Sequence, residues 1–108
     1  MELPDETAVT EELLRVGRII SKHTGCSIKS WTIAFWELDN RHEPPKLTEL
    51  ASSSYKLEDL GLAVFEYLSL CREFIVNPEG DEIEVNLTSM TFKRGKVNVD
   101  FYITPSIV

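Results

Sequence analysis

The sequence predicts an α+β domain in which two helices pack on a mostly antiparallel sheet that ends in a C-terminal hairpin. Two segments carry apolar residues at spacings of three and four, which is the pattern of an amphipathic helix. Other segments carry apolar residues at alternate positions, which is the pattern of a strand. The expected order is α-β-(β)-α-β-β, where the bracketed strand is an ambiguous segment. Residues 1–108 suit one domain with an ordinary core.

The first helix is expected in the N-terminal quarter of the chain. Its apolar stripe consists of Val9, Leu13, Val16 and Ile20. Thr7 or Thr10 is the expected N-cap, because a side-chain oxygen there accepts a hydrogen bond from an unsatisfied backbone N–H. Lys22 and His23 suit the negative end of the helix dipole, and Gly25 suits the left-handed position that ends a helix.

The first strand is expected at residues 30–38, where apolar side chains occupy both faces. Trp31, Ile33 and Phe35 alternate there with Ala34, Trp36 and Leu38. A strand without a polar face is expected in the interior of the sheet. Two adjacent prolines predict a loop at residues 41–45, because proline lacks a backbone donor. Residues 46–55 fit either a helical turn or a short edge strand beside the first strand.

The second helix is expected at residues 57–74. Its apolar stripe consists of Leu60, Val64, Tyr67, Cys71 and Phe74. Asparagine, proline and glycine gather at residues 77–80, which predicts a turn after this helix.

The last quarter of the chain, residues 83–103, predicts a β-hairpin. A two-residue turn at Arg94 and Gly95 places Phe92 opposite Val97 and gathers the apolar residues on one face. Polar and amphipathic residues of the last strand then share the opposite face: Asn98, Asp100 and Tyr102.

The apolar pattern changes parity within this segment, since Ile83 and Val85 alternate out of phase with Met90. A β-bulge near Thr88 and Ser89 is expected to turn the face of the strand over. With that bulge, one strand carries both apolar runs.

The chain is acidic, with 18 acidic and 11 basic residues and a net charge of −7. Such a charge repels phosphate backbones and attracts basic proteins, so nucleic acid is not expected as a direct partner. The N-terminus lacks the apolar core of a signal peptide, and no apolar run has the length of a membrane span. A cytoplasmic protein without a membrane partner is expected, with Cys26 and Cys71 as reduced thiols.

The residue patterns predict no catalytic set, no metal site and no cofactor. The soft ligands are scattered at spacings that fit no zinc pattern: His23, Cys26, His42 and Cys71. The glycines are isolated, so a phosphate-binding loop is not expected. An alternative is a small hydrolase that uses paired carboxylates, either Glu37 with Asp39 or Glu82 with Glu84.

Acidic residues gather near two of the predicted strands. Glu79, Asp81, Glu82 and Glu84 lead into the third strand, and Glu37, Asp39 and Glu43 leave the first. If these strands are neighbours, the two groups form one negative surface. Trp36 and Tyr102 lie beside these acids and suit the anchoring of a protein partner. The alternative is that both aromatic residues belong to a second core face covered by a helix.

The hairpin resembles that of the small YezG-type immunity proteins. That family carries a TS-x-T-F strand, a Gly-Lys turn and an N-x-D-F/Y strand. The matching positions are Thr88-Ser89, Thr91-Phe92, Gly95-Lys96, and Asn98 with Asp100. The resemblance implies a non-catalytic antidote that occludes a cognate bacterial toxin domain one to one. Such toxins are often nucleases of competition systems such as contact-dependent growth inhibition. The chain departs from the family pattern at residues 41–55.

A basic toxin nuclease suits an interface in which acids surround aromatic anchors. The expected partner-binding residues are Trp36, Glu37, Asp39, Asp100 and Tyr102. The chain itself is expected to be a monomer or a weak homodimer. An alternative function is a self-associating adaptor or structural domain that dimerises through the strand with Trp31 and Trp36.

Overall fold

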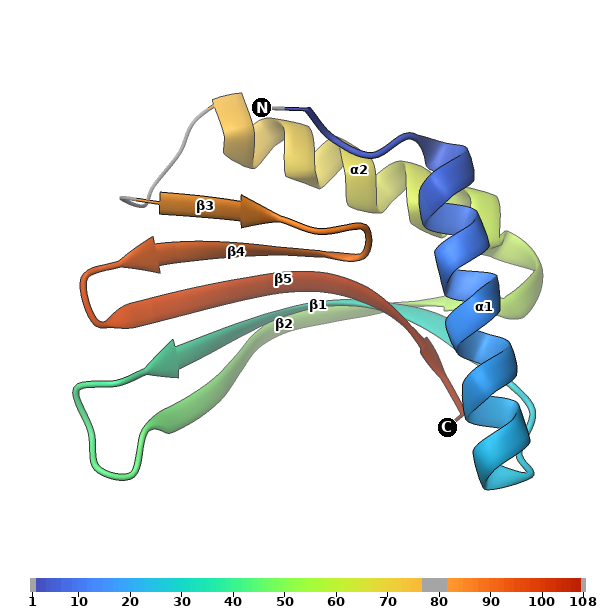
Figure 1. Cartoon of the computed structure of the whole chain (residues 1–108), viewed down its shortest axis with the longest axis horizontal. Coiled ribbons are helices and arrows are strands. Elements are labelled where there is room, and N and C mark those ends of the chain that lie inside the picture. Colours follow the sequence, from blue (N-terminus) through green and yellow to red (C-terminus); the bar gives the residue numbers. More distant parts are fainter. Residues whose placement is uncertain (1, 77–81, 108) are drawn as a thin grey trace.

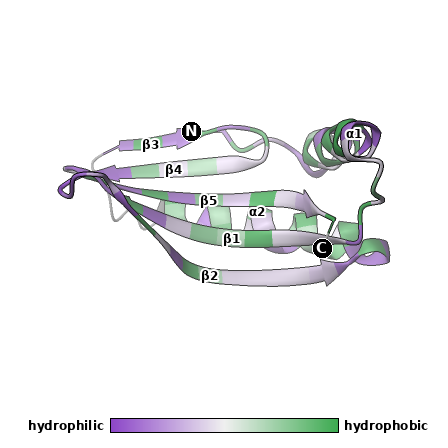
Figure 2. Ribbon diagram, turned by 90° about the horizontal axis from the view of Figure 1, so that it is seen from below, coloured by the Kyte–Doolittle hydropathy of each residue, from purple (hydrophilic) through white to green (hydrophobic). Residues whose placement is uncertain are grey.

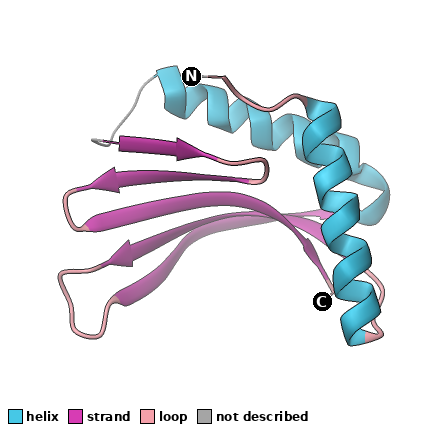
Figure 3. Ribbon diagram, in the orientation of Figure 1, coloured by secondary structure: helices cyan, strands magenta, loops and turns pink. Residues whose placement is uncertain are grey.

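The computed structural model describes residues 2–76 and 82–107, which form two layers, one of helices and one a five-stranded sheet (Figures 1 and 3). In chain order the elements are α1 (Glu6–Thr24), β1 (Ser30–Asp39), β2 (Lys46–Lys56), the 3₁₀-helix η1 (Leu57–Asp59), α2 (Leu60–Val76), β3 (Glu82–Val85), β4 (Ser89–Arg94) and β5 (Val97–Ser106). The strands run antiparallel in the order β2-β1-β5-β4-β3. The predicted α+β class and element order are confirmed, while the turn expected at residues 77–80 lies outside the described residues.

The N-cap of helix α1 lies two residues before Thr7 and five before Thr10, the two predicted caps. Asp5 is the N-cap, and its Oδ1 accepts a hydrogen bond of 2.8 Å from the Ala8 N–H. Thr7 and Thr10 lie inside the helix, so the prediction of a threonine cap was wrong. The predicted end is confirmed, because Gly25 adopts the left-handed conformation with φ of 71°.

The core lies between the helices and one face of the sheet. Phe101 is at its centre, with ring centroids 4.4 Å from Phe35 and 5.0 Å from Tyr67. The buried side chains around it come from both helices and from alternate strand positions: Val9, Leu13, Trp31, Ile33, Ala63, Val64, Leu68, Cys71, Met90, Phe92 and Ile103. The predicted stripe of the second helix is confirmed, since its middle residues are buried and its end residues are partly buried.

The segment left open at residues 46–55 is an edge strand. β2 spans 11 residues and pairs along its whole length with β1, so the strand alternative is confirmed. Phe35 lies opposite Ala51 but Trp36 lies opposite Glu49, so Leu50 is the extra residue of a β-bulge. β1 has a neighbour on each side, β2 and β5, which confirms its interior position.

The predicted bulge near Thr88 and Ser89 was wrong, because the chain reverses direction there. β3 and β4 form a hairpin in which Ile83 lies opposite Phe92 and the Asn86 N–H donates to the Ser89 carbonyl. Directly opposite residues of an antiparallel pair share a face. The hairpin therefore explains the change of parity that the bulge was meant to explain.

The last turn is displaced by one residue from its predicted place. Gly95 and Lys96 form the loop, Arg94 lies opposite Val97, and Phe92 lies opposite Val99. Gly95 has φ of 58°, so the left-handed position falls on the glycine rather than on Arg94. The register error is two residues, an even number, so the predicted faces of both strands are retained.

Replacing Gly25 with alanine is expected to lower the free energy of unfolding by about 1 kcal/mol, because an L side chain is disfavoured at positive φ. The same change at Gly61, which is helical, is expected to raise it by roughly 0.5 kcal/mol. An added Cβ meets no atom within 4 Å at either position, so the comparison isolates the backbone. Urea denaturation measures both changes, and shifts of the same sign would contradict the prediction.

Candidate functional site

The candidate site lies on the face of the sheet that points away from the helices, called the open face below. In Figure 2, α2 lies behind β1 and β5 and no helix of the described chain lies in front of these strands. Residues of β1 alternate between the core and this face, which places Trp36 on the open face and Phe35 against the core. The alternative that a helix covers Trp36 and Tyr102 was therefore wrong.

Trp36 is flanked by carboxylates on two neighbouring strands. It lies opposite Glu49 of β2 and opposite Asp100 of β5. Tyr102 lies opposite Ala34, which makes it the diagonal neighbour of Trp36 on the same face. These four side chains, Trp36, Glu49, Asp100 and Tyr102, are called the aromatic–acidic cluster.

The cluster is compact enough for its members to affect one another electrostatically. Partial burial raises the pKa of Tyr102, the Trp36 indole N–H opposes that rise, and the charges of Glu49 and Asp100 add to it. The indole nitrogen is shielded from solvent, and no acceptor among the described residues meets hydrogen-bond geometry with it. The Tyr102 hydroxyl consequently stays protonated at neutral pH and can donate a hydrogen bond.

A cross-strand hydrogen bond orients the Asp100 carboxylate. The Thr91 hydroxyl of β4 donates to Asp100 Oδ1 over 2.8 Å, and the two residues lie directly opposite each other. This contact holds a charged side chain in one orientation on a rigid sheet. A partner that binds there loses less side-chain entropy than with a freely rotating carboxylate.

The five predicted partner-binding residues do not share one surface. Trp36, Asp100 and Tyr102 come together on the open face. Glu37 points to the helix side of the sheet, where it lines a cavity of about 290 Å³. The other residues around that cavity are Phe35, Leu50, Phe74, Phe92, Arg94 and Val99. Glu37 is thus separated from Trp36 by the thickness of the sheet.

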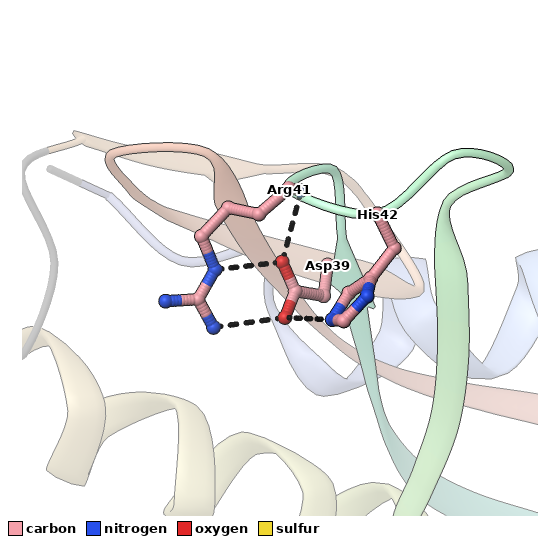
Figure 4. A network of polar contacts seen from close by, with 3 residues as sticks. All are labelled: Asp39, Arg41 and His42. Atoms are coloured by element: carbon pink, nitrogen blue, oxygen red, sulfur yellow. Dashed lines mark hydrogen bonds and ion pairs between the residues drawn. The ribbon is translucent and has the colours of Figure 1, made fainter.

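Asp39 is engaged by the loop that follows it (Figure 4). The Arg41 guanidinium donates to both carboxylate oxygens, over 2.9 Å from Nε and 2.8 Å from the second nitrogen. The Arg41 backbone N–H donates to the same carboxylate, and His42 Nε2 lies 3.3 Å from Oδ2. These contacts hold the pKa of Asp39 well below its usual range, with the Arg41 side chain as the largest cause. The Asp39 carboxylate therefore holds the loop that contains Arg41 and His42.

The two acidic groups near the first and third strands do not merge into one surface. β1 and β3 are separated in the sheet by β5 and β4, so the condition that they be neighbours is not met. Glu82 and Glu84 are exposed on the opposite edge strand, and Glu79 and Asp81 lie outside the described residues. Negative charge on the open face comes instead from Glu49 and Asp100.

Sequence reasoning missed Glu49, Thr91 and Arg41. Glu49 was missed because residues 46–55 had no assigned structure, and the bulge at Leu50 changes which residues of that segment share a face. A detectable signal existed for Arg41, since an arginine two residues after a strand-ending aspartate favours a loop ion pair.

The strand that carries Trp31 and Trp36 is not an exposed edge. Trp31 is 2% exposed, and its Nε1 donates to the Leu57 carbonyl over 3.0 Å. β1 is paired on both sides, so association through this strand would require the sheet to open. Trp36 alone of the two tryptophans contributes to a surface.

The two thiols lie in opposite environments. Cys26 is exposed, and Cys71 is buried in α2. Burial raises the pKa of Cys71 to about 11, although the Tyr67 hydroxyl and the charge of Arg72 act in the other direction. Cys71 is consequently a neutral core side chain at physiological pH.

Comparisons with protein-family models, with curated proteins and with solved structures find no match for this chain. Within residues 2–76 and 82–107, no group of three or more histidine, cysteine, aspartate or glutamate residues is placed to hold a metal ion. No helix in the described part of the chain combines the length and apolar character needed to cross a membrane.

Replacing Asp39 with asparagine is expected to lower the melting temperature at neutral pH, because the ion pair with Arg41 is lost. A lowered folded-state pKa stabilises the fold above the ordinary value of 3.8, and this contribution disappears as the pH falls toward the folded-state pKa. The difference in melting temperature between wild type and Asp39→Asn should therefore become smaller below pH 3.8, as measured by thermal denaturation. Glu43→Gln in the same exposed loop is the control, and a gap that stays constant with pH would contradict the prediction.

A thiol reagent at mildly alkaline pH is expected to modify Cys26 rapidly and Cys71 only after unfolding, because Cys71 is buried and its pKa is about 11. Absorbance at native and denaturing conditions counts the reactive thiols, and the Cys26→Ser variant identifies which one reacts. Rapid reaction of native Cys26→Ser would show that this part of the core is open.

Proposed function

We propose that this chain is an immunity protein that binds a cognate bacterial toxin domain, a basic nuclease, and neutralises it by non-catalytic one-to-one occlusion. The observation that carries the proposal is the aromatic–acidic cluster on the open face, where Trp36 is flanked by Glu49 and Asp100. Aromatic side chains within a polar, charged surround are the composition of protein-binding hot spots.

The charge of the chain supports this choice of partner. A nuclease holds phosphates with basic side chains, and a net charge of −7 steers an inhibitor toward such a surface. The acids nearest the aromatic residues lie on two strands that flank β1, so negative charge surrounds Trp36 from both sides. Long-range attraction accelerates encounter, and the carboxylates then suit arginine or lysine side chains that otherwise hold phosphate.

The rigidity of the surface supports it as well. The four residues of the cluster project from three paired strands, and the Thr91 hydroxyl holds the Asp100 carboxylate. A preorganised surface reduces the entropy cost of binding. Tyr102 supplies a hydroxyl donor beside its aromatic ring, a combination that is enriched in interfaces.

The family resemblance supports the same function from the sequence. The positions that resemble YezG-type immunity proteins include Thr91 and Asp100, which form the hydrogen bond on the open face. We infer that this motif holds the interface acid in place. The proposed partner is the toxin domain encoded by the adjacent open reading frame, and the proposed location is the cytoplasm.

The test is titration calorimetry of the full chain with that adjacent toxin domain. One-to-one binding is expected, weakening by roughly tenfold or more when salt rises from about 50 mM to about 500 mM, because salt screens exposed charges. Tyr102→Ala is expected to weaken binding roughly tenfold or more, as for a hot-spot residue. Phe65→Ala, which truncates a 52% exposed aromatic residue of α2, is the matched control.

Circular dichroism of both variants verifies that they are folded before binding is compared. Absence of binding by wild type would overturn the proposed function. If Tyr102→Ala and Phe65→Ala lost equal amounts of binding affinity, the open face would not be the interface. Binding that does not change with salt would remove the electrostatic part of the proposal.

A further inference from the structure

The outer edge of β2 is a long strand edge without a neighbour. β2 spans 11 residues and is the terminal strand of the sheet, and no other described element lies along its outer side in either view (Figures 1 and 2). Most of its side chains are exposed, and its centre consists of Ser52, Ser53 and Ser54. Small side chains leave the backbone donors and acceptors of an edge accessible to another strand.

A second copy of β2 fits this edge in a particular antiparallel register. Opposite residues of an antiparallel pair share a face, so Ser53, which lies opposite Ile33 on the helix side, can pair with Ser53 of the partner subunit. The two-fold axis then passes through this pair and stands perpendicular to the sheet. Ser52 lies opposite the partner's Ser54, and Ala51 lies opposite the partner's Tyr55.

The bulge at Leu50 determines which residues pair at the two ends of this register. Because Leu50 is an extra residue, the next pair joins Glu49 to the partner's Lys56. Both residues point to the open face, since Glu49 lies opposite Trp36 and Lys56 lies opposite Ser30. Two-fold symmetry repeats the pair, so each copy contributes one acid and one base at opposite ends of the interface.

We propose that two copies of this chain associate through their β2 edges in this register and form one continuous antiparallel sheet. The self-complementary pairing of Glu49 with the partner's Lys56 is the feature that favours a second copy over an unrelated strand. Leu50 is 52% exposed and lies near the partner's Tyr55 in this register, which adds apolar contact on the helix side.

The association is expected to stop at the dimer. The other edge strand, β3, has four residues, and two of them are the exposed acids Glu82 and Glu84. Short and charged edges resist further strand addition. The net charge of −7 on each copy also opposes association, so a weak dimer is expected.

The dimer would place both open faces on the same side of the joined sheet, because the two-fold axis is perpendicular to it. Trp36, Asp100 and Tyr102 of both copies then remain exposed on the same side, while Glu49 pairs with the partner's Lys56. The inference does not rest on the proposed function, since it concerns the chain alone and its test includes no toxin.

Sedimentation velocity of the full chain across a concentration series tests the proposal. Wild type is expected to show a monomer–dimer equilibrium. Glu49→Lys places a lysine opposite the partner's Lys56 at both ends of the interface, and Lys56→Glu places a glutamate opposite the partner's Glu49. Like charges repel, so each variant alone should dimerise roughly tenfold or more weakly than wild type. The matched controls with the same charge changes elsewhere are Glu73→Lys on α2 and Lys29→Glu before β1, both at exposed positions.

Mixing the two singly reversed variants is the decisive measurement. A Glu49→Lys copy and a Lys56→Glu copy complement each other in the proposed register, so an equimolar mixture should restore the dimer as a heterodimer. Ser53→Lys, which faces its own copy across the axis, should weaken the dimer without restoration by either variant. A strict monomer for wild type, dimerisation of each single variant at wild-type strength, or a mixture that stays monomeric would overturn the proposal.

Discussion

The structure depends on the packing of one apolar stripe of α2 against one face of the sheet. Phe101 at the centre of that contact touches rings from β1 and from α2, and α1 adds Val9 and Leu13 at its border. Both helices of residues 2–76 and 82–107 pack on the same face, so no described helix covers the other face. The apolar residues of β1 on the open face, Trp36 above all, must therefore be shielded by their neighbours within the sheet.

That arrangement explains why aromatic and acidic side chains occur together. Trp36 is half-buried between Glu49 and Asp100, and Tyr102 covers it from the diagonal position. A tryptophan that is shielded only by polar neighbours keeps apolar surface available to a partner. The polar neighbours that shield Trp36 from water also give the open face the composition of a binding surface. This links the fold to the proposed immunity function.

The sequence allowed prediction of both helices, of β1 and of the hairpin of β4 and β5, but it placed β3 and β4 in one bulged strand. Helical spacing identified α1 and α2, and the two apolar faces of β1 identified an interior strand. The segment of β2 stayed ambiguous between a helical turn and an edge strand, because an exposed edge strand has no buried face and hence no alternation. The separation of Glu37 from Trp36 follows from strand alternation, but the ion pair of Asp39 depends on the path of a loop, which local patterns do not specify.

The pairing of β1 with β5 also has a consequence for synthesis of the chain. β1 is made early, whereas the strand that covers its second edge, from Val97 to Ser106, is made after all the other described elements. Until then β1 has β2 on one side and an unsatisfied edge, rich in tryptophan and phenylalanine, on the other. Until β5 is available to pair, the nascent chain is therefore prone to edge-to-edge aggregation through β1.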